Sequence, residues 1–189
     1  MNDKSIVLID GGYLTKLTKN EFADSSGQPI KLDFAKLGQI IASQCGSELI
    51  RTYYYDSPPH VGQRPTPEDR ARQEGFDRFI YNLRKMDKFE VRLGSLKKFY
   101  LEDSSVKFEQ KGVDVLLAID ALRLTLKGKI TKAIFITGDA DFVPVIKAIK
   151  DEGVEVFLYY HDSSVHRNIL EVCDNKIIIK KELMNGCVR

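Results

Sequence analysis

Asp139 and Asp141 are separated by one residue and end the segment IFITGDADF, which spans residues 134–142. The apolar run predicts a buried strand, and the two carboxylates fall on the turn into the helix that follows. One interpretation is that Asp141 caps that helix by accepting backbone N–H bonds while Asp139 fills the turn. The other is that both side chains bind a hard cation, whose preferred ligands are oxygens. The pair alone leaves both interpretations open.

Two further aspartates can join this pair. Asp10 ends the run SIVLI and precedes two glycines, a pattern that predicts a buried parallel strand breaking into a loop. Asp114 falls in the first turn of a predicted helix, where the helix dipole also stabilises an acid. Ligands of parallel sheets bind outside the carboxyl ends of strands, where the strand order reverses. If the strands that end at Asp10 and Asp139 are neighbours at that reversal, the four carboxylates share one crevice.

Such a cluster requires compensation of its charge. Two like charges about 4 Å apart repel by about 4 kcal/mol at an effective dielectric of 20, so the acids need protons or a cation. Oxygen ligands without His or Cys favour Mg²⁺ or Mn²⁺ over Zn²⁺. A divalent ion can activate water and neutralise charge on a phosphate, and we therefore expect hydrolysis of phosphodiester bonds.

The elements that must position these residues alternate along the chain. Hydrophobic periodicity predicts strands at residues 5–9, 48–55, 131–137, 154–160 and 176–179, and helices at 32–45, 68–87, 113–126, 141–151 and 164–173. This α/β alternation predicts a three-layer αβα sandwich with a mainly parallel central sheet. Residues 57–67 hold four of the six prolines and predict a loop, and residues 90–110 predict a strand and a small hairpin insertion with its turn at 103–105. Helix 113–126 is apolar nearly all round, which predicts burial against the sheet.

Length and composition set the remaining limits. The 189 residues suit one domain at 1–183 with a flexible C-terminal tail at 184–189. The net charge of +2 identifies no partner, but residues 60–98 hold ten Arg or Lys against six acids. That segment, with Arg64 and Arg70, is either an RNA-binding surface or an ordinary charged helix face.

The expected compartment is the cytoplasm. The three cysteines are scattered without a CxxC pair, which argues against a disulfide framework and favours a reducing environment. No secretory leader and no apolar segment of about 20 residues is seen, so we expect no membrane partner. The sequence leaves both a monomer and a homodimer open.

Three segments resemble the NYN domain family of the PIN-like nuclease superfamily: IVLIDGGYL at 6–14, QKGVDVLLAIDALRL at 110–124 and FITGDADFVPVIKAIKDEGVEV at 135–156. The resemblance implies a parallel sheet in the order 3-2-1-4-5 and a metal-dependent ribonuclease that uses Mg²⁺ or Mn²⁺ on RNA, with single-stranded RNA as the expected partner. By motif position it implies metal-binding and catalytic roles for four residues, namely Asp10, Asp114, Asp139 and Asp141.

Four neighbours of the motifs have alternative roles. Asp120 lies on an apolar helical face, where it either pairs with a buried base or joins the metal ligands. Lys111 and Thr137 match the family's pattern and could contact substrate, although Lys111 could equally be a solvated amine. Tyr13 stands where many members have Asn, and it could stack on a base or simply pack. One tyrosine of the run 53–55 could also stack on a base.

Two other functional classes compete with a ribonuclease. A catalytically weak or inactive RNA- or protein-binding module of the same fold would keep the elements but work by recruitment. A topoisomerase-primase domain or a haloacid dehalogenase phosphatase also places acids on such a sheet. The first of these expects Glu on an early strand and the second a DxD motif on the first strand, so both fit this chain poorly.

Overall fold

A six-stranded parallel sheet forms the centre of the molecule in the computed structural model, which describes the chain except residues 1, 63 and 101–105 and the side chains of 96–111. The order of its strands is β3-β2-β1-β6-β7-β8. The strands are β1 (Lys4–Asp10), β2 (Glu48–Asp56), β3 (Phe89–Leu93), β6 (Lys132–Ile136), β7 (Glu155–Tyr160) and β8 (Asn175–Ile178). The predicted order 3-2-1-4-5 is therefore confirmed, and β8 extends it at one edge.

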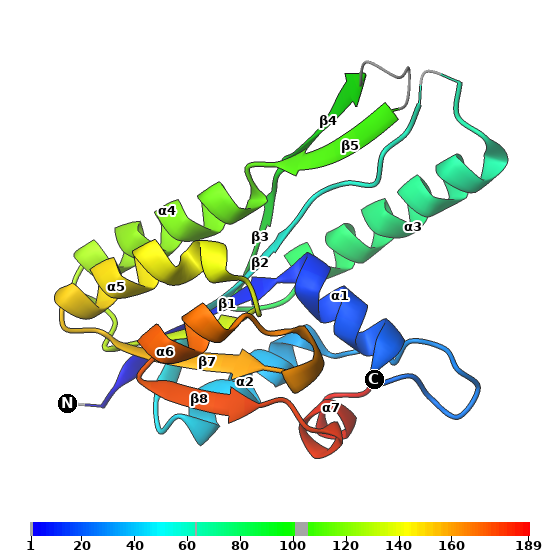
Figure 1. Cartoon of the computed structure of the whole chain (residues 1–189). Coiled ribbons are helices and arrows are strands. Elements are labelled where there is room, and N and C mark those ends of the chain that lie inside the picture. Colours follow the sequence, from blue (N-terminus) through cyan, green and yellow to red (C-terminus); the bar gives the residue numbers. More distant parts are fainter. Residues whose placement is uncertain (1, 63, 101–105) are drawn as a thin grey trace.

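Helices cover both faces of this sheet (Figure 1). They are α1 (Gly11–Asn20), α2 (Phe34–Gln44), α3 (Pro67–Arg84), α4 (Val113–Leu126), α5 (Val143–Asp151), α6 (Arg167–Val172) and α7 (Lys181–Gly186). Alternate side chains of β1 separate the two cores: Val7 and Ile9 pack with α1, α2, α3 and α7, while Ile6 and Leu8 pack with α4, α5 and α6. The predicted three-layer sandwich is confirmed.

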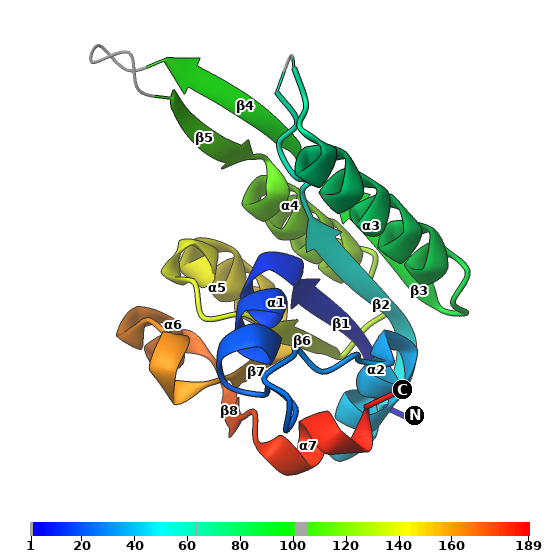
Figure 2. The same ribbon diagram turned by 90° about the vertical axis from the view of Figure 1, so that its right-hand side faces the viewer.

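The strands β4 (Ser95–Tyr100) and β5 (Val106–Lys111) form the predicted hairpin as a separate antiparallel pair. Its predicted turn at 103–105 lies outside the described residues. The hairpin and the N-terminal part of α3 extend beyond the carboxyl edge of the sheet (Figures 1 and 2). No helix in the described part of the chain is long and apolar enough to cross a membrane.

Two predictions about the chain's ends and connections are wrong. The strand β1 does not break into a loop, because α1 begins at Gly11, directly after Asp10. The segment 184–189 is not a flexible tail: Met184 and Cys187 are buried, and the Arg189 amide donates to the Lys31 carbonyl at 3.0 Å. Apolar side chains within the last turn therefore anchor this end of the chain to the core.

Helix α4 is less buried than its composition predicts. Val115, Ile119 and Leu126 are 59%, 56% and 61% exposed, whereas Leu117 and Ala121 face the core. A helix that lies on one face of a sheet can bury only one side, so the apolar residues on its other side remain in contact with solvent.

Gly11 allows α1 to start at the sheet edge, and replacing it with Ala should destabilise the fold. A Cβ there would lie 2.5 Å from Cζ of Tyr54 and 2.7 Å from the carbonyl oxygen of Tyr55, whereas a Cβ on Gly12 would meet only Asp10 Oδ1 at 3.5 Å. We expect Gly11→Ala to lower the unfolding free energy by about 1–3 kcal/mol. The control Gly12→Ala should be neutral or slightly stabilising in the same thermal unfolding measurement, and equal effects of the two substitutions would contradict this packing account.

Candidate active site

The strand order reverses between β1 and β6, and the predicted acids gather at this point. The two strands are parallel neighbours with Ile9 paired to Ile136, so the residues that follow them emerge side by side. Asp10 is the last residue of β1, and Asp139 comes three residues after the end of β6. The chain continues from Asp10 into α1, and from Asp139 into the 3-10 helix η1 (Ala140–Phe142).

Asp10 is held by two donors. Its Oδ1 accepts the Tyr13 backbone N–H at 2.9 Å, which caps α1, and its Oδ2 accepts the Thr137 hydroxyl at 3.0 Å. Burial raises the pKa of Asp10, these two bonds lower it, and the charges of Asp139 and Asp56 raise it further. The carboxylate is therefore fixed in direction but carries an unfavourable charge in the absence of a cation.

The structural interpretation of the pair predicted Asp141 as the helix cap and Asp139 as a turn residue, but Asp139 is the cap. Asp139 Oδ1 accepts the Asp141 backbone N–H at 2.9 Å, so Asp139 caps η1. The Asp139 amide in turn donates to Thr137 Oγ1 at 3.2 Å. The Asp141 side chain is exposed and bonds to none of the described residues, so its carboxylate is available to a ligand.

Asp114 lies in the first turn of α4, and its exposed side chain belongs to the same electrostatic group. Partial desolvation by the surrounding protein contributes most to raising the pKa of Asp114, followed by the charges of Asp10, Asp139 and Asp141. The structure therefore brings the four predicted acids close enough to repel one another. We call Asp10, Asp114, Asp139 and Asp141 the acidic cluster.

The acidic cluster fits a hard divalent cation by donor chemistry and charge. It offers only carboxylate oxygens, which suit Mg²⁺ or Mn²⁺, and positive charge would relieve the repulsion. As the side chains stand, no group of three His, Cys, Asp or Glu within the described residues is arranged to hold a metal ion. Asp139 is held by its cap on η1, whereas the exposed side chains of Asp114 and Asp141 form no hydrogen bond with the described residues, so ligation would require these two to rotate towards Asp10.

Thr137 and Tyr13 position this edge of the sheet. Thr137 is fully buried and its hydroxyl contacts both Asp10 and Asp139, so it orients acids and is shielded from substrate. The Tyr13 hydroxyl accepts the His161 backbone N–H at 2.9 Å, and its ring lies against Gly138. Tyr13 therefore packs, as one of its two predicted roles required, and the base-stacking role is not supported.

Gly138 is required by this packing. A side chain there would collide with the Ser164 carbonyl oxygen. The Gly138 carbonyl accepts the His166 backbone N–H at 2.9 Å. The turn that presents Asp139 is thereby clamped against the segment after β7. His161 and His166 act locally as caps, on η2 (Asp162–Ser164) and α6.

Asp120 belongs to an ion-pair network. Its Oδ2 accepts from Arg92 Nε at 3.2 Å and from the Tyr55 hydroxyl at 3.2 Å, and its Oδ1 accepts from Arg123 at 2.7 Å. Arg92 also pairs with Glu90 at 2.9 Å. Of the two predicted roles, the structure shows pairing with bases, which satisfies the carboxylate without a metal.

The other residues predicted to contact substrate differ in their exposure. Arg64 and Arg70 are exposed, in the 57–66 loop and on α3, while the side chain of Lys111 lies outside the described residues. The three tyrosines at 53–55 are all buried, so the prediction that one of them stacks on a base is wrong.

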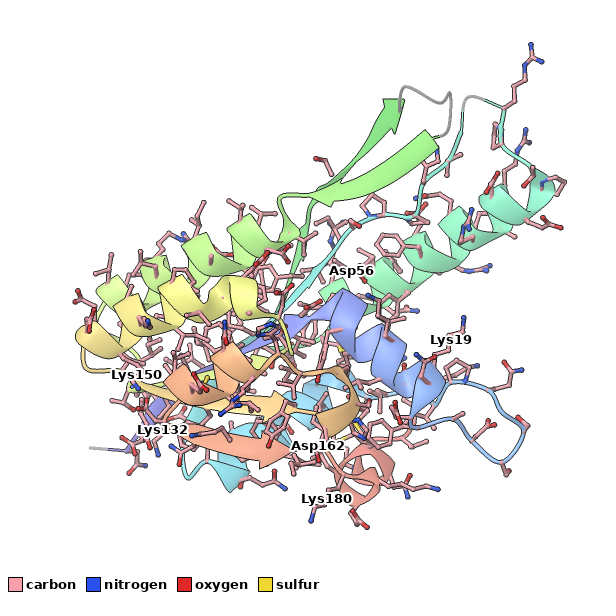
Figure 3. The ribbon with its side chains drawn as sticks, in the orientation of Figure 1. Lys19, Asp56, Lys132, Lys150, Asp162 and Lys180 are labelled. Atoms are coloured by element: carbon pink, nitrogen blue, oxygen red, sulfur yellow. The ribbon has the colours of Figure 1, made fainter. Side chains whose placement is uncertain are left out.

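Asp56 is an acid at this edge that the sequence reasoning missed. It ends β2 beside Asp10, accepts the Tyr54 hydroxyl at 2.8 Å and the Ser57 amide at 2.8 Å, and its pKa is raised by burial. Figure 3 labels it at the edge from which α3 and the hairpin extend. Asp56 directly follows the predicted strand 48–55, and this position could have identified it as an acid at the carboxyl edge of the sheet.

The comparison with protein families decides the relationship that the motifs suggested. The model of the NYN domain matches residues 4–180, nearly the whole chain. The chain belongs to the NYN domain family. This family comprises PIN-like nucleases, which supports nuclease function at the level of the family.

One solved structure supports the fold of this NYN domain. A protein of unknown function from Vibrio parahaemolyticus RIMD 2210633 superimposes with a TM-score of 0.63 at 17% identity, covering 100% of this chain and 97% of its own. Acinetobacter baumannii MurG aligns with a TM-score of 0.41 at 10% identity, over 93% of this chain and 45% of its own. No curated protein matches the sequence significantly.

Replacing Asp120 with Asn should separate its structural role from metal binding. The substitution removes the charge that pairs with two partly exposed arginines, so we expect a loss of about 1–2 kcal/mol, or about 2–8 °C in Tm. Mn²⁺ affinity, measured by isothermal titration calorimetry, should stay within about twofold of wild type, because the Asp120 carboxylate is already paired with Arg92 and Arg123. A tenfold loss of Mn²⁺ affinity with unchanged stability would instead assign Asp120 to the metal site.

Proposed function

We propose that this NYN domain is a metal-dependent ribonuclease that hydrolyses phosphodiester bonds with Mg²⁺ or Mn²⁺ held by the acidic cluster. The observation that supports this most strongly is the gathering of Asp10, Asp114, Asp139 and Asp141 at the strand reversal, where burial first and the charges of neighbouring carboxylates second raise the pKa of both Asp10 and Asp114. A bound cation would compensate the negative charge of the acidic cluster and could also activate a water molecule for hydrolysis.

The four carboxylates fall into two pairs, one held by hydrogen bonds and one exposed. Asp10 is fixed by the Tyr13 amide and the Thr137 hydroxyl, and Asp139 is fixed by the cap of η1. Asp114 and Asp141 are exposed and can turn towards a ligand or a water molecule. When bound, a divalent ion lowers the pKa of a coordinated water and offsets charge on the phosphate. No side-chain nucleophile is then required.

Three features support RNA as the substrate. The NYN family acts on RNA, the chain has a basic segment at 60–98, and exposed arginines of that segment lie on α3 beside the carboxyl edge. Exposed arginines bind phosphates without reading the sequence, which suits contacts to the backbone of a single strand. We further propose that the protein acts in the cytoplasm, as its three unpaired cysteines suggest.

A non-catalytic RNA-binding module is the second candidate, and the separation of the acids favours it. In the described chain the side chains form no ready-made group of three ligands. If the module only recruits RNA, then removing a carboxylate should leave RNA binding intact or improve it, because repulsion between acid and phosphate is lost.

The variant Asp139→Asn tests the proposed activity. Asn retains an oxygen to cap η1, so the fold should persist, while one charged ligand is lost. We expect Mn²⁺ affinity by calorimetry to fall about tenfold or more and cleavage of labelled single-stranded RNA to fall about 100-fold or more. EDTA should abolish cleavage by the wild type, and added Mn²⁺ should restore it.

Asp151→Asn provides the matched control, because Asp151 is an exposed aspartate at the far end of α5. It should leave both Mn²⁺ affinity and cleavage unchanged. Equal Mn²⁺ binding and equal cleavage by wild type and Asp139→Asn would overturn the assignment, and RNA binding without cleavage by the wild type would favour the recruitment module.

A further inference from the structure

A groove of about 1020 Å³ lies between α1, α3, the segment 24–34 and the last residues of the chain. One face of α3 lines it with Gly75, Arg78, Phe79 and Asn82, in which the adjacent pair Arg78 and Phe79 lies three or four residues from Gly75 on one side and from Asn82 on the other. Helix α1, which starts at the acidic cluster, forms the opposite wall; Figure 1 shows the two helices on the same side of the molecule.

The groove has an aromatic floor and a basic rim. Phe34 and Phe79 meet edge to face with ring centroids 5.6 Å apart at its base. Arg78 and Lys31 are exposed at its rim, and neither pairs with an acid of the described chain. The acid that lines the groove, Asp24, is occupied by the Ser26 and Gln28 amides at 2.8 and 2.9 Å. The groove therefore suits a ligand that combines a flat apolar ring with a negative charge.

The floor of the groove reaches the carboxyl edge of the sheet through Tyr54. The Tyr54 ring packs edge to face against Phe34 at 5.4 Å and Phe79 at 5.7 Å, and its hydroxyl donates to Asp56 at the carboxyl edge. Along α1, Thr15 lies five residues after Asp10, which is about 7–8 Å at the helical rise. That distance corresponds to about two stacked nucleotides of a single strand.

We propose that this groove binds a nucleotide of the single-stranded RNA, about two positions from the scissile phosphodiester. The base lies on the partly exposed Phe79 ring, which packs edge to face on the buried Phe34, and the Arg78 guanidinium and Lys31 ammonium bind the flanking phosphates. The inference rests on the proposed function for the position of the scissile bond, but it concerns binding and is measured without cleavage.

Arg78→Ala tests this groove, with Arg84→Ala as the matched control. Both arginines are exposed on α3, but Arg84 does not line the groove. The probe is a short fluorescein-labelled single-stranded oligouridylate, titrated by fluorescence anisotropy in EDTA so that no cleavage occurs. Both variants should melt like wild type, since neither arginine forms an ion pair with the described residues.

We expect Arg78→Ala to weaken RNA binding about tenfold and to reduce the slope of log Kd against log salt by about 0.7, the loss of one phosphate contact. Arg84→Ala should change binding by less than about twofold. Equal weakening by the two variants would show bulk electrostatics and overturn the groove assignment, as would unchanged binding by Arg78→Ala or a wild type that binds no RNA.

The same titration distinguishes this inference from the proposed activity. If wild type binds RNA and loses affinity only on Arg78→Ala, yet cleaves nothing with Mn²⁺, the groove stands and the ribonuclease assignment fails. If wild type cleaves RNA while Arg78→Ala binds the probe normally, the ribonuclease stands and the groove assignment fails.

Discussion

Repulsion between carboxylates at the reversal of the strand order is the constraint on which the rest of this molecule depends. Parallel strands that share a core must end at the same edge, so Asp10 and Asp139 are brought together by the packing of β1 against β6. Asp114 and Asp141 join them from helix starts. Burial of the apolar core stabilises the fold, and this free energy holds the carboxylates together at the edge of the sheet despite their repulsion.

The backbone around the acids is built to withstand this repulsion. Gly11 lets α1 begin without a loop, so the Tyr13 amide reaches Asp10. Gly138 lets the turn before Asp139 approach the segment after β7, where Tyr13 contacts it. Two carboxylates held by hydrogen bonds, those of Asp10 and Asp139, and two exposed ones, those of Asp114 and Asp141, can adapt to a cation without rearranging the fold.

The sequence predicted the sheet well because its information is local and periodic. The apolar runs at 5–9 and 131–137 and the helix 113–126 are long enough to identify from spacing alone. Placing the acids at one edge then required only the rule for parallel sheets. The helix after Asp10 was missed because two glycines usually predict a turn, and the close packing of Gly11 against β2 cannot be seen from local pattern.

Roles set by long-range contacts were harder to predict. Asp120 could be a ligand or an ion-pair partner until its distance to Arg92 and Arg123 was known. The last residues of the chain looked frayed because the contact between Arg189 and Lys31 joins segments remote in sequence. The groove beside α1 is likewise assembled from four separate segments, none of which has a motif of its own.

Anomalous diffraction from a crystal soaked in Mn²⁺ is the most direct measurement of the central claim. The account predicts an anomalous peak among the carboxylates of Asp10, Asp114, Asp139 and Asp141, with the exposed side chains of Asp114 and Asp141 rotated towards it. Absence of a peak there at saturating Mn²⁺, with the four side chains unchanged, would contradict it.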